Sequence, residues 1–268
     1  MNAPSHAPTV AEPILLRSAT GGVVTLTLNR PAQFNALSCA MLTELQAALD
    51  AIAADESARV VVIAGAGKAF CAGHDLKEMR ANPSREFQQA LFDQCSRVML
   101  TLTRMPQPVI ARVHGIATAA GCQLVSMCDL AVAVSEARFA VSGVNLGLFC
   151  STPSVGLARN VGRKAALEML FTGGFIDAEE ARARGLVNRV VPAAELDAAI
   201  GALTAAILAK TPVAIRLGKA MFYRQVEMGL DGAYDLAAQV MADNMMSCDA
   251  QEGIDAFIEK RAPNWQGR

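Results

Sequence analysis

The sequence predicts an α/β fold for its first 200 residues and a largely helical part after them. Continuous Val and Ile runs, as in RVVVIAG (59–65) and DLAVAV (129–134), are typical of parallel strands buried on both faces. Apolar residues at helical spacing separate these runs, which is the pattern of a chain of strand and helix units. Strand signals nearly end after about residue 150, with VNRVV (187–191) as the exception.

The first elements carry clear start and stop signals. VVTLTL (23–28) alternates Val and Leu with Thr, the two-residue period of a strand with one buried face. The NRP turn that follows leads to Ser38, a residue type that often caps a helix N-terminus. Apolar residues then recur every three or four positions and predict a helix that ends near Asp55. After the next strand, a Gly-rich loop leads to Asp75 and Glu78, which predict a capping box.

Later elements continue this alternation and then become helical. Apolar residues from Phe87 to Leu102 mark a long helix that stops before MPQP, and PVIARVHG (108–115) is a strand. A helix through Gln123 precedes the strand 129–134. The helices expected after residue 150 are RKAALEML, DAEEARARG, ELDAAIGALTAAILAK, a run from 212 to 228 and a last one ending at IEKR.

Composition limits the possible functions. Of 268 residues, 53% are hydrophobic and 18% are charged, so the chain can bury a large core and has little polar surface. Part of its surface is therefore expected in an oligomer interface. The formal net charge of −1 gives nucleic acid no broad electrostatic attraction. We expect a flexible tail at 1–13, a core with the functional site at 14–200 and a helical part at 201–268.

Cysteine and histidine usage bears on compartment and metals. Seven cysteines form no CxxC pair and mostly lie in apolar stretches, as buried thiols in a reducing compartment do. The three histidines show no metal-ligand spacing, so no metal site is expected. The first twelve residues resemble neither a signal nor a transit peptide, and the longest candidate span, 198–209, is too short to cross a bilayer. We therefore expect a cytoplasmic protein without membrane contact.

Two Gly- and Ala-rich segments lie directly before predicted helices. In GAGKAFCAGHD (65–75), Ala69 follows the lysine and Phe70 replaces a third glycine, so neither a Walker loop nor a GxGxxG motif is present. In TAAGCQL (118–124), small side chains would let a ligand approach the positive end of a helix. Two free N–H groups there would form an oxyanion hole. The alternative is close packing between elements, which also favours small residues.

Four segments, in order along the chain, resemble the crotonase family, also called the enoyl-CoA hydratase/isomerase family: NRPAQFNAL, GKAFCAGHDL, HGIATAAGCQLVSMCD and IEKRAPNW. The resemblance runs from about residue 14 to 265. It implies a crotonase-like spiral of repeated ββα units, and a homotrimer or dimer of trimers formed through the helical part 201–268. It also implies an acyl-CoA thioester as ligand. Coenzyme A would be part of the substrate, so no separate cofactor is expected.

The resemblance also implies site residues. The oxyanion hole would consist of the backbone N–H groups of His74 and Ala120, in the two Gly- and Ala-rich segments. Such a hole stabilises the charge on a thioester oxygen when the neighbouring carbon is attacked or deprotonated. Acyl-CoA contacts are implied at Arg30, Gln33, Ala72, His74, Asp75, Leu76, Lys77, Ile116, Lys260 and Arg261. The four Lys and Arg residues among them would meet the coenzyme's phosphates, unless they are solvated surface charges.

Two positions depart from the family pattern. Gln123 and Gly143 stand where the resemblance places the two glutamates that hold and activate water in hydratases. An amide does not ionise and glycine has no side chain, so neither residue is a general base. Because each acid–base group contributes about 10²- to 10⁴-fold, ordinary hydration should be nearly lost. The resemblance is closest to a subgroup named enoyl-CoA hydratase domain-containing proteins.

Other residues offer alternatives for the missing base. Asp75 is a helix cap or a base, the His74 imidazole is a base in addition to its N–H, and Cys150 is a nucleophile if a positive group lies beside it. Gly143 would also leave room for bicarbonate, which stands in for the carboxylate in naphthoate synthases of the family. Two functions follow: a hydratase/isomerase-type enzyme in which Gln123 holds water or substrate, and a non-catalytic acyl-CoA-binding or regulatory protein.

Overall fold

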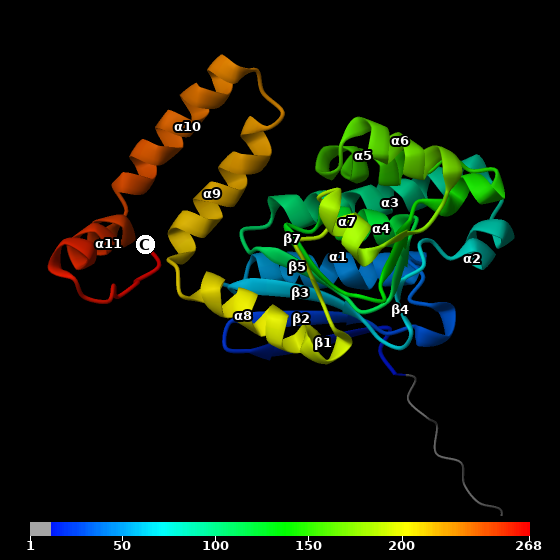
Figure 1. Cartoon of the computed structure of the whole chain (residues 1–268), viewed down its shortest axis with the longest axis horizontal. Helices are drawn as coiled ribbons and strands as arrows, with labels where there is room; N and C mark the ends of the chain where they lie inside the picture. The colour runs from blue at the N-terminus through cyan, green and yellow to red at the C-terminus, as the bar shows by residue number, and fades with distance from the viewer. Residues whose placement is uncertain (1–11) are drawn as a thin grey trace, which may run out of the picture.

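The computed structural model describes residues 12–268, so nearly all of the tail expected at 1–13 lies outside the described residues. The described chain is an α/β body from which the last three helices project as an arm (Figure 1). The predicted α/β class with a helical C-terminal part is confirmed. The expected boundary at residue 200 falls inside helix α8 (Leu196–Leu208), which contacts the sheet of the body.

Within residues 12–268, strands form two sheets. The larger sheet has the order β1 (Leu15–Thr20), β2 (Val23–Leu28), β3 (Val60–Gly65), β5 (Val109–Val113), β7 (Leu130–Val134) and β10 (Arg189–Val191). The smaller sheet has the order β4 (Ala69–Cys71), β6 (Ile116–Thr118), β8 (Arg138–Ala140) and β9 (Ile176–Asp177). Only the first pair of the larger sheet and the last pair of the smaller sheet are antiparallel.

Three strand pairs divide between the two sheets. β3, β5 and β7 enter the larger sheet, and the strands that follow them, β4, β6 and β8, enter the smaller sheet. Helices follow each pair, so the chain advances as a spiral of ββα units, and this prediction is confirmed. Figure 1 shows α1 and α3 on one side of the larger sheet and α8 on the other. Cover on both faces explains why β3 is a continuous Val and Ile run rather than an alternating one.

The helices begin largely where the capping signals predict. They are α1 (Cys39–Ala53), α2 (Leu76–Ala81), α3 (Arg85–Arg104), α4 (Ala120–Met127), α5 (Ser151–Asn160), α6 (Arg163–Thr172), α7 (Ala178–Ala183), α8, α9 (Pro212–Gln225), α10 (Leu230–Met245) and α11 (Cys248–Glu259). Short 3-10 turns are η1 (Pro31–Gln33), η2 (Ser142–Leu146) and η3 (Ala193–Glu195). Ser38 Oγ accepts the Met41 N–H at 3.2 Å, which confirms the predicted start of α1.

Three local predictions need correction. The capping box at Asp75 is only half formed, because Glu78 Oε2 accepts the Cys39 N–H at 2.9 Å instead of turning back to its own helix. The loop expected at 65–75 contains strand β4, which pairs with β6 too briefly to leave a periodic signal. The strand expected at 187–191 begins only at Arg189, since the Asn188 side chain accepts the Ala131 N–H at 2.8 Å.

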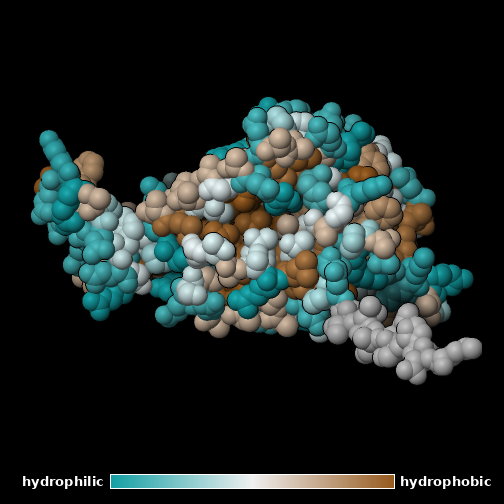
Figure 2. Space-filling view, turned by 90° about the horizontal axis from the view of Figure 1, so that it is seen from below, coloured by the Kyte–Doolittle hydropathy of each residue, from teal (hydrophilic) through white to brown (hydrophobic). Residues whose placement is uncertain are grey.

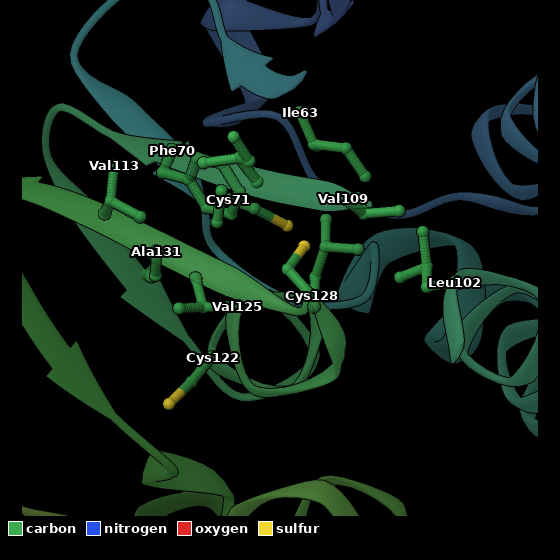
Figure 3. Packing of buried hydrophobic residues seen from close by; sticks show 14 of the residues in the cluster. Ile63, Phe70, Cys71, Leu102, Val109, Val113, Cys122, Val125, Cys128 and Ala131 are labelled. Atoms are coloured by element: carbon green, nitrogen blue, oxygen red, sulfur yellow. The ribbon is translucent and has the colours of Figure 1, made fainter. Parts of the chain in front are cut away.

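The core joins the sheets to α1, α3 and α4. Figure 3 shows Cys71, Cys122 and Cys128 among the Val, Ile, Leu and Phe side chains of this core. Burial raises the pKa of Cys71 and of Cys122 to about 12, so both remain thiols at neutral pH. These cysteines act as small hydrophobic residues, as predicted.

The arm of α9, α10 and α11 carries much exposed apolar surface. Phe257 is 84% exposed and Ile258 is 70% exposed. Figure 2 shows further apolar residues between hydrophilic ones on the lower face of the body, with the arm at the left. Within residues 12–268 no single helix has both the length and the apolar character needed to cross a membrane; only the sharply bent pair of helical segments 193–208 and 212–225 meets the criteria together.

A buried ion pair holds the arm to the body. Lys219 on α9 donates to Asp129 Oδ2 at 2.7 Å, and also to the carbonyl oxygens of Leu102 and Gln107. Asp129 accepts two more hydrogen bonds, from Tyr223 OH at 2.8 Å and from the Val109 N–H at 2.7 Å. The side chains of Lys219 and Asp129 are 7% and 16% exposed, so water screens their attraction little.

We expect Lys219→Met to destabilise the protein by about 3–5 kcal/mol, because it leaves the Asp129 carboxylate buried without its cation. The free energy of unfolding in urea measures the effect. Lys164→Met is the matched control, since Lys164 is exposed on α6. Equal stability of the two variants would show that the ion pair does not hold the arm.

Candidate functional site

An apolar cavity of about 300 Å³ opens between three parts of the spiral. One wall comes from the β4–α2 loop, α2 and α3, and another from the start of α4. The third comes from η2 and the segment that leads into α5. Leu76, Met79, Phe92, Leu148 and Phe149 give it a mainly apolar lining.

Two backbone segments meet at one edge of this cavity. A Cβ at Gly73 would lie 2.9 Å from the Cβ of Ala119 and 3.3 Å from the backbone nitrogen of Ala120. Gly73 also has a φ of +96°, which disfavours other residues. Among the described residues, the N–H groups of His74 and Ala120 have no hydrogen-bond acceptor. Both residues line the cavity. The predicted pair of donors is therefore brought together, free, at one edge of an apolar space.

Ala119 adopts a strained backbone conformation at this point, with φ of 50° and ψ of −120°. A non-glycine residue in such a region costs about 1–3 kcal/mol and is typical of functional sites. The Ala119 N–H donates to Ala140 O at 3.0 Å, which ties the turn to β8. The strained residue lies directly before Ala120, the first residue of α4, and both line the cavity. In the sequence, only the run of small residues hints at this strained conformation of Ala119.

Close packing holds the two segments in place. A Cβ at Gly121 would lie 2.0 Å from Cys71 O, so α4 rests directly on the backbone of β4. On the other side, the Leu37 N–H donates to Gly73 O at 2.7 Å. The two interpretations of the small residues are thus compatible, because the packing positions the free donors.

Asn35 was missed as a site residue by the sequence analysis. It is fully buried with a φ of 56°, and its amide donates to Ala66 O and Ala69 O, both at 2.8 Å. Its Oδ1 accepts the Arg30 N–H at 2.9 Å. Asn35 therefore fixes the loop after β3 that leads to the cavity. The signal was present as Asn in FNAL, since Asn tolerates positive φ and bonds nearby backbone.

Asp75 is a cap and not a free base. It accepts the Lys77 N–H at 3.1 Å and the Glu78 N–H at 3.3 Å, and it pairs with Arg30 at 3.1 Å. Partial burial raises the pKa of Asp75, but the hydrogen bonds from Glu78 and Arg30 outweigh it and hold the pKa below its ordinary value. Arg30 also donates to Ala36 O at 3.1 Å, so both terminal nitrogens of its guanidinium have partners within the chain.

The two positions expected to lack glutamates behave differently. Gln123 is 4% exposed and does not line the cavity, and its Oε1 is buried without a partner. Gly143 does line the cavity, but a Cβ there would lie 2.6 Å from Leu148 O and 2.7 Å from Cys150 Sγ. The segment after η2 fills the space of a side chain at 143. The expected room for bicarbonate beside Gly143 is reduced by the same contacts.

Two residues lining the cavity have titratable side chains, His74 and Cys150. Cys150 Sγ accepts the Gly143 N–H at 3.3 Å, but burial raises its thiol pKa, which opposes a role as nucleophile. Burial lowers the pKa of His74, so its imidazole is neutral at pH 7. Within residues 12–268, no group of three His, Cys, Asp or Glu side chains is arranged to hold a metal ion.

Only some of the residues predicted to contact acyl-CoA line the cavity. Ala72 and Leu76 line the cavity with His74, Ala120 and Gly143. The predicted contacts outside its lining are Arg30, Gln33, Asp75, Lys77, Ile116, Lys260 and Arg261. The last two follow α11, at the opposite end of the molecule from α2 (Figure 1). Arg261 is paired there with Glu252 and Glu259.

Residues 18–268 match the family model of the enoyl-CoA hydratase/isomerase family. The chain belongs to this family. A solved enoyl-CoA hydratase from Mycobacterium smegmatis is 62% identical with a TM-score of 0.94, and the match covers 95% of this chain and 99% of that one. Human mitochondrial enoyl-CoA hydratase domain-containing protein 3 is 47% identical over 244 residues, which are 91% of this chain and 80% of that protein. Its crystal structure has a TM-score of 0.92 at 45% identity, and the match covers 94% of this chain and 100% of that one.

The names of these relatives contradict the expected cytoplasmic location, which is therefore wrong. The domain-containing protein 3 relatives from rat, mouse, human and Xenopus laevis, at 44–47% identity, are named mitochondrial. The sequence argument failed because cysteine usage separates reducing from oxidising compartments and does not distinguish two reducing ones. The other part of the argument concerned residues 1–12, of which only Glu12 lies within the described chain.

We expect Gly143→Ala to lower the free energy of unfolding by about 1–3 kcal/mol, because the added methyl group overpacks the segment after η2. Thermal or urea unfolding measures the loss. Gly162→Ala is the control: Gly162 has a φ of −61° and a ψ of 148°, which alanine adopts without strain, and nothing lies within 4 Å of the added Cβ. If Gly143→Ala were no more destabilising than Gly162→Ala, the space at position 143 would be open.

Proposed function

We propose that the chain binds an acyl-CoA thioester with the thioester oxygen between the N–H groups of His74 and Ala120. The observation that carries this proposal is the meeting of two unpaired backbone donors at the edge of an apolar cavity. Donors fixed before the reaction stabilise charge without reorganising, and each is worth about 3 kcal/mol in the transition state. Family membership supports the choice of a thioester over other carbonyl compounds.

The acyl group in this proposal is uncharged and aliphatic. The cavity lining within the described chain includes no Lys or Arg, and His74 is neutral at pH 7. An acyl chain ending in a carboxylate would lose its hydration there without gaining a cation. Leu76, Met79 and Phe92 would contact the hydrocarbon tail.

The reaction we propose is of the hydratase/isomerase type and passes through a thioester enolate. The hole would stabilise this enolate, and Gln123 would at most shape the wall of the site, since it does not reach the lining. The second candidate is a non-catalytic acyl-CoA-binding or regulatory protein. The absence of any carboxylate from the described cavity lining favours this alternative.

We propose that Lys260 and Arg261 bind the coenzyme's phosphates only when several copies of the chain assemble. Lys260 and Arg261 lie on the arm, far from the cavity of their own chain, while Lys77 is exposed close to it. A homotrimer or dimer of trimers would bury the apolar residues of the arm, such as Phe257 and Ile258. It would also bring the arm of one copy toward the cavity of another.

Two measurements separate the candidate functions. Calorimetry with butyryl-CoA, which cannot react, tests binding, and loss of enoyl absorbance from crotonyl-CoA tests hydration. Binding with turnover supports the enzyme, and binding without turnover supports the regulatory protein. A chain that binds neither ligand would contradict the proposal as a whole.

We expect Gly73→Ala to weaken the hole. The added methyl group presses on Ala119 and forces the two donors apart, so turnover should fall by about 10²- to 10³-fold. Steady-state kinetics with crotonyl-CoA measures this, and calorimetry with butyryl-CoA measures it for an inactive chain as weaker binding. Gly21→Ala is the matched control: Gly21 has a φ of +57° but no atom within 4 Å of the new Cβ. Equal activity and affinity of both variants would argue against the hole.

A further inference from the structure

We propose that Nε2 of the His74 imidazole is the proton acceptor of this site. It would accept a hydrogen bond from a water molecule and take that proton during hydration, and it would accept a hydrogen bond from the hydroxyl on the third carbon of the 3-hydroxyacyl product. The inference rests on the proposed acyl-CoA function and assigns the base that the site otherwise lacks. In this role His74 would contribute twice, through its backbone N–H and through its side chain.

The hydrogen bond on the other side of the ring fixes the tautomer. Nδ1 of His74 lies 3.3 Å from Leu37 O. A carbonyl oxygen only accepts, so Nδ1 carries the hydrogen. In a neutral ring Nε2 then holds a lone pair. Burial keeps the ring neutral by lowering the pKa of His74, against weaker opposing effects of Leu37 and Glu78.

This lone pair has no partner within the described residues. Nε2 is closed off from solvent and accepts no hydrogen bond. A buried polar atom left unpaired costs about 1–3 kcal/mol. His74 lines the cavity, and its ring meets Phe92, another lining residue, edge to face, with centroids 5.5 Å apart. Because Nε2 is closed off in the described chain, ligand binding must uncover it, by a shift of the ring or of a side chain packed against it. A donor that arrives with the ligand or with a bound water would remove the cost, which explains why the orphaned acceptor is tolerated here.

Among the described residues that line the cavity, no other group competes for this role. Cys150 has a raised thiol pKa, and the hydroxyl of Ser142 is neutral and hydrogen-bonded to Thr118 Oγ1 at 2.9 Å. The carboxylates near the cavity already have hydrogen-bond or ion-pair partners within the chain. Glu78 on α2 accepts the Cys39 N–H, and Asp75 pairs with Arg30.

One base is sufficient for hydration of an enoyl thioester. The water oxygen bonds to the third carbon while Nε2 takes one water proton. The electron pair of the carbon–carbon double bond moves to the thioester oxygen, which the two backbone N–H groups stabilise as an enolate. The imidazolium then returns the proton to the second carbon. The product is the 3-hydroxyacyl thioester, and the ring is neutral again.

His74→Asn tests the inference with little change in structure. Asparagine can still donate from its amide to Leu37 O and keeps the backbone N–H, but it has no atom at the place of Nε2. With crotonyl-CoA, kcat should fall by about 10²- to 10⁴-fold, while the affinity for butyryl-CoA changes less than threefold. Added imidazole should restore part of the rate. His114→Gln is the matched control, because His114 bonds Gly67 O through Nε2 outside the cavity and also has an unpaired nitrogen.

The pH profile gives a readout that a structural role would not change. A base must be unprotonated, so kcat/KM of the wild type should fall as pH drops through the pKa of His74, below the ordinary value of 6.5. This acid limb should vanish in His74→Asn. An unchanged kcat in that variant, or an unchanged acid limb, would overturn the inference.

The ¹⁵N resonance of Nε2 separates this inference from the proposed function. If butyryl-CoA fails to bind the wild type, the proposed function fails. If it binds, 3-hydroxybutyryl-CoA should shift the Nε2 resonance relative to butyryl-CoA. Identical Nε2 resonances in the two complexes would overturn the role of His74 alone, even for a chain without turnover.

Discussion

The close approach of two backbone segments, at Gly73 and at Ala119–Ala120, is the constraint on which the rest of the site depends. The ββα spiral creates this approach, because β4 and β6 are parallel neighbours in the smaller sheet and the segments after them meet at one edge. Gly121 lets α4 rest on β4, and Gly73 leaves room for Ala119. The strain at Ala119 is maintained by packing on both sides.

The proposed function assigns the main binding task to the backbone, which leaves the side chains free to differ. Two N–H groups need no particular residue type, so His74 and Ala120 could provide them as well as any other residues would. The proposed hole is thus compatible with a cavity whose described lining contains no carboxylate. At Gly143 the difference extends beyond one residue, because Leu148 and Cys150 fill the space of its side chain. Restoring a carboxylate there would require rebuilding the segment that follows η2.

Periodicity and capping signals predicted most of the fold. The Val and Ile run of β3, the Ser38 cap of α1 and the small residues before α4 all lead to the elements observed. Short strands such as β4 and β9 were missed, since two or three residues carry no period. The conformation of Ala119 and the ring environment of His74 depend on contacts between distant segments, which one sequence does not display. The partners of Arg30 within the chain, Ala36 O and Asp75, were likewise not visible in the sequence.

Infrared spectroscopy of a bound thioester, labelled with ¹³C at the carbonyl, tests the central claim most directly. Two hydrogen bonds to the thioester oxygen polarise the carbonyl and weaken its double bond. The account predicts that the carbonyl band of bound butyryl-CoA lies at lower frequency than in free solution. A band at the free-solution frequency, with the ligand demonstrably bound, would contradict the claim that the N–H groups of His74 and Ala120 converge on that oxygen.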